Sequence, residues 1–347
     1  MPPVKLRPDL FPRERREIIP RLVLPALVAL LFAGTMSPAD EMKSTFLAGN
    51  SRIDVALENV PPQFAAQNFM EWVHWASDSV ITYYGKFPVP HLSLRISLFD
   101  GKGVRNGQTF GGDQGGRIFI HAGRDSNEHD LAADWMLTHE MIHLAFPSVA
   151  DEHHWIEEGL ATYVEPIARV RAGHLAVTRM WSDFARDLPQ GLPGKGDRGL
   201  DHTHTWGRTY WGGALFCFLA DIEIHRRTQN QKGLEDALRG ILNAGGDIRD
   251  EWDLVKTLKI GDDATGVAVL VPLYNQMKDQ PYDPDLTALW KDLGIERAGD
   301  TVRFIDTAPL ARTRKAITYG AQSAGDSRGM AAPNVSVFAG RTARNVP

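Results

Sequence analysis

One short segment places three polar side chains inside a run of residues that is otherwise apolar. His139, Glu140 and His143 form the pattern His-Glu-x-x-His, and residues 131–146 around them carry large apolar side chains on nearly every side. Such a run predicts a helix that is buried all round. Residues four apart lie on one face of a helix, so the two imidazoles can point at one place while Glu140 lies beside them. Polar side chains are costly to bury without partners, and a metal ion would supply one.

The pattern indicates a catalytic zinc site. Two histidines one turn apart on a helix, with a glutamate after the first, are typical of zinc peptidases, in which the glutamate is the general base. Such a zinc takes three protein ligands and one water, so a third ligand is needed. Glu158, fifteen positions after His143, is the best candidate. We therefore expect one Zn²⁺ per chain, on His139, His143 and Glu158. The alternative is a chance occurrence of the pattern, with no metal.

Residues 155–169 predict a second helix with a polar stripe. Glu158, Thr162 and Glu165 fall at i, i+4 and i+7 among apolar positions, so they share one face, which we expect to meet the first helix. Gly159 follows Glu158 directly. Glycine is unfavourable inside a helix, so its presence indicates close approach of the backbone to a neighbouring helix or ligand.

Simpler roles for several polar and aromatic residues are also compatible with the sequence. Glu158 belongs to a cluster of acidic residues, and most such clusters are solvated surface. His153 or His154, in the loop before the second helix, would be the third ligand if Glu158 were not. Tyr210, before an apolar segment and close to a glycine pair, is most simply a packed aromatic side chain.

With these motifs the sequence resembles the gluzincin metallopeptidases, in particular the group of aminopeptidase N and leukotriene A4 hydrolase and the related glycyl aminopeptidases. In that group the glutamate before the glycine is the third zinc ligand, which corresponds to Glu158. The glutamate seven residues later supports the site, which corresponds to Glu165. A tyrosine followed three positions on by glycine, here Tyr210 and Gly213, stabilises the oxyanion. The resemblance implies a peptidase that binds a peptide or protein substrate, with Glu140 as the general base.

The sequence departs from that group in two places. The spacing between His143 and Glu158 is a few residues shorter than usual, which implies a tighter loop. The Gly-Ala-Met-Glu-Asn strand that grips the free amino terminus of a substrate has no counterpart. We therefore expect an enzyme that does not require a free amino terminus, and a strict aminopeptidase is the alternative. A metal-binding protein that holds a peptide without cleaving it is a further alternative, although it would not need Glu140.

The order of expected elements predicts the α+β class. Residues 52–60, 91–99 and 117–121 alternate apolar and polar side chains as strands do, and residues 63–84 have a helical pattern. We expect the third strand to be the edge that receives an extended peptide. From residue 129 onward the pattern is nearly all helix, with further helices near 175–187, 209–228, 232–244, 250–259, 266–279 and 284–293. A small amino-terminal sheet with helices, followed by a mostly helical lobe, agrees with the thermolysin-like gluzincin catalytic domain that the resemblance implies.

The amino terminus has the pattern of an export signal. Six basic residues precede an apolar run over 22–32, and small residues follow up to Ala39, after which we expect cleavage. The run is short for a transmembrane helix, and an uncleaved anchor is the alternative. The pattern predicts an exported protein, periplasmic or extracellular in a bacterium, without a stable membrane span in its mature form. We divide the chain into a signal (1–39), an α/β part (40–130), a helical zinc-binding part (131–310) and a partly disordered extension (311–347).

Charge and cysteine content restrict the partners. The net charge is -5 and no basic patch is evident, so we expect no nucleic acid to bind. The single cysteine, Cys217, lies in an apolar segment and is expected to pack in the core, because it has no partner for an internal disulfide.

Overall fold

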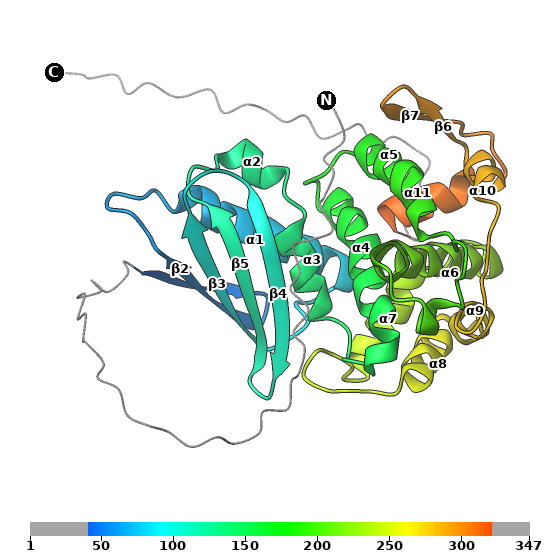
Figure 1. The fold of residues 1–347 in the computed structure, drawn as a ribbon, viewed down its shortest axis with the longest axis horizontal. Helices are drawn as coiled ribbons and strands as arrows, with labels where there is room; N and C mark the ends of the chain where they lie inside the picture. Colours follow the sequence, from blue (N-terminus) through cyan, green and yellow to red (C-terminus); the bar gives the residue numbers. More distant parts are fainter. Residues whose placement is uncertain (1–40, 321–347) are drawn as a thin grey trace, which may run out of the picture. The chain divides into compact units, whose positions relative to one another are not determined.

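The computed structural model describes residues 41–320, which form a five-stranded sheet and a helical lobe (Figure 1). The expected signal segment with its cleavage site at Ala39, and residues 321–347 of the expected extension, lie outside the described residues. The sheet region consists of strands β1 (Met42–Ala48), β2 (Ser51–Glu58), β3 (His91–Phe99), β4 (Val104–Gly112) and β5 (Gly115–Gly123), with helix α1 (Gln67–Tyr84) between β2 and β3.

The strands lie in the order β1-β2-β3-β5-β4. The three central strands are parallel, and the edge strands β1 and β4 are antiparallel to their neighbours. Parallel neighbours need a crossover connection, which α1 provides between β2 and β3. The alternation seen in the sequence creates one apolar face, on which Ile53, Leu94 and Ile118 are fully buried. The strands predicted over 52–60, 91–99 and 117–121 are thereby confirmed as β2, β3 and β5.

The edge strand beside the helical lobe is β4, so the expectation that residues 118–120 form the edge is wrong. Those residues belong to β5, which is paired with β3 on one side and with β4 on the other. The sequence of β4 contains three glycines and few β-branched residues, a composition that does not favour strands. Its strand conformation comes from pairing with β5, which sequence patterning does not show.

The helical lobe follows the sheet region in the chain. Its helices are α2 (Glu128–Ala132), α3 (Met136–His143), α4 (His154–Arg171), α5 (Val177–Asp187), α6 (Gly213–Arg227), α7 (Leu234–Asn243), α8 (Leu254–Thr265), α9 (Leu270–Met277), α10 (Leu286–Leu293) and α11 (Ala311–Tyr319). A short hairpin of β6 (Ile295–Ala298) and β7 (Thr301–Phe304) and the helix α11 were not expected. The helix α11 packs against α4 and α6, so residues 311–319 are part of the lobe. Within residues 41–320, no helix is long and apolar enough to cross a bilayer.

The buried segment 131–146 is two helices and not the single helix expected. The side chain of Asp134 accepts a hydrogen bond of 3.2 Å from the backbone nitrogen of Leu137, which stabilises the beginning of α3. Helix α3 contacts β4 and α4 and lies between the sheet and the larger helices (Figure 1). The segment with the His-Glu-x-x-His pattern is therefore buried from both sides.

Helices α4 and α6 cross with their backbones in contact. A Cβ atom on Gly159 would lie 2.2 Å from the Cα atom of Gly213, and one on Gly213 would lie 2.0 Å from the carbonyl oxygen of Trp155. No side chain fits at either position, so the close backbone approach predicted at Gly159 is confirmed. This crossing fixes the distance between Glu158 and Tyr210, which lie near the two glycines in the sequence.

We expect Gly213→Ala to destabilise the protein by about 1–3 kcal/mol or more, as for an overpacked core. Helix propensity alone would favour alanine by about 1 kcal/mol, but the overlap with the backbone of α4 is the larger effect. Gly194→Ala is the matched control, because its added Cβ would meet no atom within 4 Å. Urea unfolding of the two variants measures the difference, and equal stability would contradict the backbone contact.

Candidate metal centre

Three side chains meet where α3 faces α4. The rings of His139 and His143, one turn apart on α3, have their centroids 4.9 Å from each other. Glu158 on α4 approaches both, with its Oε2 atom 3.2 Å from Nε2 of His139 and 3.7 Å from Nε2 of His143. The structure thus brings together the three residues that the sequence selected as metal ligands.

The arrangement fits one metal ion. The three ligand atoms all lie within 4.8 Å of one another. Bonds of 2.0–2.2 Å to a tetrahedral ion separate its ligand atoms by about 3.3 Å, close to the distances between Glu158 and the two imidazoles. Two imidazoles and one carboxylate form a donor set of catalytic zinc sites and leave one position for water.

The charges within this group favour a cation beside Glu158. Burial raises the pKa of Glu158, but the neighbouring imidazoles lower it by a larger amount. The pKa of Glu158 therefore lies below its usual range. Burial holds the pKa of His143 below its usual value. Burial also lowers the pKa of His139, yet the hydrogen bond and charge of Glu158 outweigh it and raise the pKa. The site therefore attracts a positive charge, which a metal ion would supply in place of the proton.

Glu140 is held by the edge strand. The hydroxyl of Thr109 lies 2.6 Å from Oε2 of Glu140 and 3.0 Å from its carbonyl oxygen. A Cβ atom on Gly107 would lie 2.6 Å from Cγ of Glu140, so only glycine leaves room for this side chain. Sequence reasoning did not identify Thr109 or Gly107. The only signal was a glycine within a strand, which marks a close approach but not its partner.

Tyr210 joins the group from the other side. It lies in a π-helical segment, Gly207–Gly212, which leads into α6. Segments of this kind are rare and occur often at functional sites. Its ring is nearly parallel to that of His139, at 20° and 6.4 Å between centroids. Burial, together with the charges of Glu158 and Glu140, raises the pKa of Tyr210, so its hydroxyl keeps its proton.

Glu165 lies two turns after Glu158 on α4 and is buried. Its Oε1 atom accepts a hydrogen bond of 2.8 Å from Arg169, and Arg169 donates a second bond of 2.7 Å to the carbonyl oxygen of Ala132. The charge of Glu165 also acts on His139. Glu165 therefore holds Arg169, which connects α4 to the end of α2, and its charge acts on the site without joining the ligand group.

His153, just before α4, and His154, its first residue, have other partners. Nδ1 of His153 lies 3.0 Å from a buried oxygen of Asp201. His154 contacts Glu157 at 2.9 Å and Oε1 of Glu158 at 3.4 Å, and these hydrogen bonds raise its pKa to about 10. Neither histidine belongs to the group of ligand atoms within 4.8 Å of one another, which His139, His143 and Glu158 form. The geometry thus favours Glu158 over either histidine as the third ligand.

A second group of metal-binding residue types lies inside the helical lobe. Asp221, His225 and Glu235 each place a ligand atom within 4.8 Å of the others. Arg171 lies 3.2 Å from Glu235, and the hydroxyl of Tyr163 donates a hydrogen bond of 2.8 Å to Asp221. Because a buried arginine supplies the compensating positive charge, we assign this group to the packing of α4 against α6 and α7.

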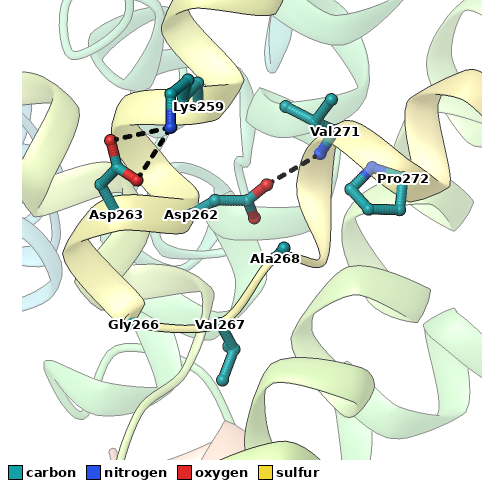
Figure 2. Close-up of a pocket in the computed structure, with 8 residues that line it drawn as sticks. All are labelled: Lys259, Asp262, Asp263, Gly266, Val267, Ala268, Val271 and Pro272. Atoms are coloured by element: carbon teal, nitrogen blue, oxygen red, sulfur yellow. Dashed lines mark hydrogen bonds and ion pairs between the residues drawn. The ribbon is translucent and has the colours of Figure 1, made fainter.

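A surface pocket lies between α8 and α9, and its polar groups stabilise the fold (Figure 2). Asp262 on its wall accepts hydrogen bonds of 2.7–3.1 Å from the backbone nitrogens of residues 269–271, where α9 begins. A carboxylate at the beginning of a helix is stabilising, because the free N–H groups and the helix dipole favour negative charge there. The pair of Lys259 and Asp263 beside it is exposed. These polar groups are occupied in stabilising α9.

Comparison with known proteins reveals similarity at the level of structure. No family model matches the chain, and no curated protein matches it in sequence. Among solved structures, an aminopeptidase N family protein from Idiomarina loihiensis is similar, with a TM-score of 0.55 and 13% identity, over 74% of this chain and 49% of that chain. An M1 zinc metallopeptidase from Deinococcus radiodurans aligns with a TM-score of 0.44 and 14% identity, over 71% of this chain and 53% of that chain.

The described residues thus share the fold of the aligned half of the aminopeptidase N family protein. The first similarity extends over most of the chain, and it confirms the expected α+β arrangement of a sheet followed by a helical lobe. The chain spans about half the length of either of these proteins.

Proposed function

We propose that this chain is a zinc-dependent metallopeptidase with His139, His143 and Glu158 as its zinc ligands. The observation that carries the proposal is the convergence of these three side chains beside Glu140, whose carboxylate Thr109 holds from the edge strand. Each member of the group is buried or half-buried, which supports a metal site over a solvated acidic surface.

Glu140, Thr109 and Tyr210 each have a separate role in the proposed hydrolysis. When bound, zinc polarises the substrate carbonyl and lowers the pKa of a water molecule. Glu140 accepts the proton of the attacking water and returns it to the leaving amine. The hydroxyl of Thr109 is hydrogen bonded to Oε2 of Glu140, which orients the carboxylate. Tyr210 keeps its proton and donates a hydrogen bond to the oxyanion that forms at the carbonyl.

We also propose that the substrate does not need a free amino terminus. The strand β4, which lies next to α3, contains no carboxylate that could grip an amine. Glu157 and Asp113 are possible substitutes. One oxygen of Glu157 accepts a hydrogen bond from the backbone of Val149 and the other contacts His154. Asp113 is exposed in the turn after β4. An extended chain could add backbone hydrogen bonds at the edge of β4 and pass through the site.

Export is part of the proposal. It is supported by the basic and apolar pattern of the first 39 residues.

Zinc content tests the ligand assignment. We expect one zinc per chain in the wild type, no zinc in His143→Ala, and strongly reduced zinc in His139→Ala and Glu158→Ala, because each removes one of three ligands. His153→Ala is the matched control, since that histidine is held by Asp201. Elemental analysis after dialysis measures the content. Wild-type levels in all three ligand variants would disprove the site.

Glu140→Gln tests the general base. The variant should keep its zinc and its fold, because the ligands remain, but lose about 10²–10⁴-fold in peptide hydrolysis. Thr109→Val should reduce kcat by a smaller factor, because the carboxylate remains but loses its orienting hydroxyl. Mass spectrometry of a peptide mixture follows the cleavage. Unchanged turnover in Glu140→Gln would exclude a mechanism in which this residue takes the proton.

Matched peptides with free and acetylated amino termini test the substrate requirement. We expect similar kcat/KM for both forms, because β4 offers no group that binds an amine. Removal of single residues from the free form only, with the acetylated form intact, would identify the enzyme as an aminopeptidase.

A further inference from the structure

Two exposed indoles stand beside the candidate metal centre. Trp135 is 43% exposed and Trp206 is 48% exposed, whereas the other seven tryptophans of the chain are buried or half-buried. Single exposed apolar side chains are ordinary on protein surfaces. What distinguishes these two is that each is in ring contact with a residue of the site.

The ring contacts form a series. Trp135 meets His139 edge to face, with 5.2 Å between centroids. The ring of His139 in turn faces the ring of Tyr210. Tyr210 stacks on Trp206 at 26° with 5.6 Å between centroids. Trp135, at one end of the series, contacts His139, a proposed metal ligand. Trp206, at the other end, contacts Tyr210, the proposed oxyanion donor.

Helix geometry explains both positions. Trp135 precedes His139 by four residues, and Trp206 precedes Tyr210 by four residues, so each indole lies on the same side of its segment as the site residue. Trp135 is the residue before α3, and Trp206 is the residue before the π-helical segment. Two segments far apart in the sequence thus place the same kind of side chain at the site.

We propose that Trp135 and Trp206 form an apolar binding surface that selects substrates with a large aromatic or aliphatic side chain next to the scissile bond. This inference rests on the proposed peptidase function, which places a peptide over His139 and Tyr210. The exposed faces of the indoles are then covered by a substrate side chain. Tryptophan is well suited to this role, since it offers a large rigid apolar area and is enriched among residues that dominate binding.

Charge is consistent with an apolar and not an acidic side chain at this place. The carboxylate of Glu140, which is not a proposed zinc ligand, acts on Tyr210, the ring on which Trp206 stacks, and it would repel an acidic residue. The indoles themselves provide no charge. An apolar side chain that stacks on them removes its own surface and theirs from water.

The experiment compares peptides that differ only at one residue beside the cleaved bond, with Phe, Leu, Gly or Asp at that place. Wild-type, zinc-loaded enzyme should cleave the Phe and Leu peptides with a kcat/KM at least about tenfold above that for Gly. Trp135→Ala or Trp206→Ala should remove most of the preference at one of the two flanking positions, and the Trp→Phe variants should restore part of it. Tyr319→Ala is the control, because Tyr319 is similarly exposed on α11.

Binding provides a second measurement. Zinc-loaded Glu140→Gln should bind the Phe peptide more tightly than the Gly peptide, and the added Trp206→Ala or Trp135→Ala substitution should remove most of this difference at the flanking position that the substituted indole serves. Hydrolysis with equal kcat/KM for Phe and Gly would overturn the indole proposal and leave the peptidase function intact. Selective, indole-dependent binding without hydrolysis by the wild type would support the indole surface and refute the peptidase function.

Discussion

The backbone contact between Gly159 and Gly213 is the constraint on which the site depends. It lets α4 and α6 approach until a Cβ atom on either glycine would overlap the other helix. Glu158 and Tyr210 lie one residue and three residues from these glycines in the sequence, so their positions follow from the crossing. A larger residue at either glycine would separate the helices, and the carboxylate and the phenol would no longer meet over α3.

Helix α3 is supported from two sides, and this arrangement compensates for the burial of its polar residues. On the sheet side, the hydroxyl of Thr109 donates a hydrogen bond to the carboxylate of Glu140. On the lobe side, Glu158 meets both imidazoles. Buried polar groups are unfavourable unless they have partners, and here the partners come from different elements of the fold. The same contacts that lower this cost also orient the groups for chemistry.

Local patterns predicted most elements and only part of the site. The alternation of 91–99 and the helical periodicity of 63–84 reproduced β3 and α1, because one face of each is buried in the core. The break between α2 and α3 was missed, since apolar residues continue across it and the sequence does not show the contact of Asp134 with the backbone nitrogen of Leu137. The strand β4 was missed because its three glycines do not favour a strand. Gly107 leaves room for Glu140 on α3, and Gly111 leaves room for the backbone of Ile248.

The sequence by itself determined the chemistry available to this protein. The spacing of His139, Glu140 and His143 puts two imidazoles and a carboxylate on one turn of any helix, and Gly159 after Glu158 marks a close approach, because periodicity and side-chain size are local properties. Only the tertiary structure decided which residues meet them. The pairing of Thr109 with Glu140 joins residues 31 positions apart in the sequence, and such a contact arises from the packing of β4 on α3.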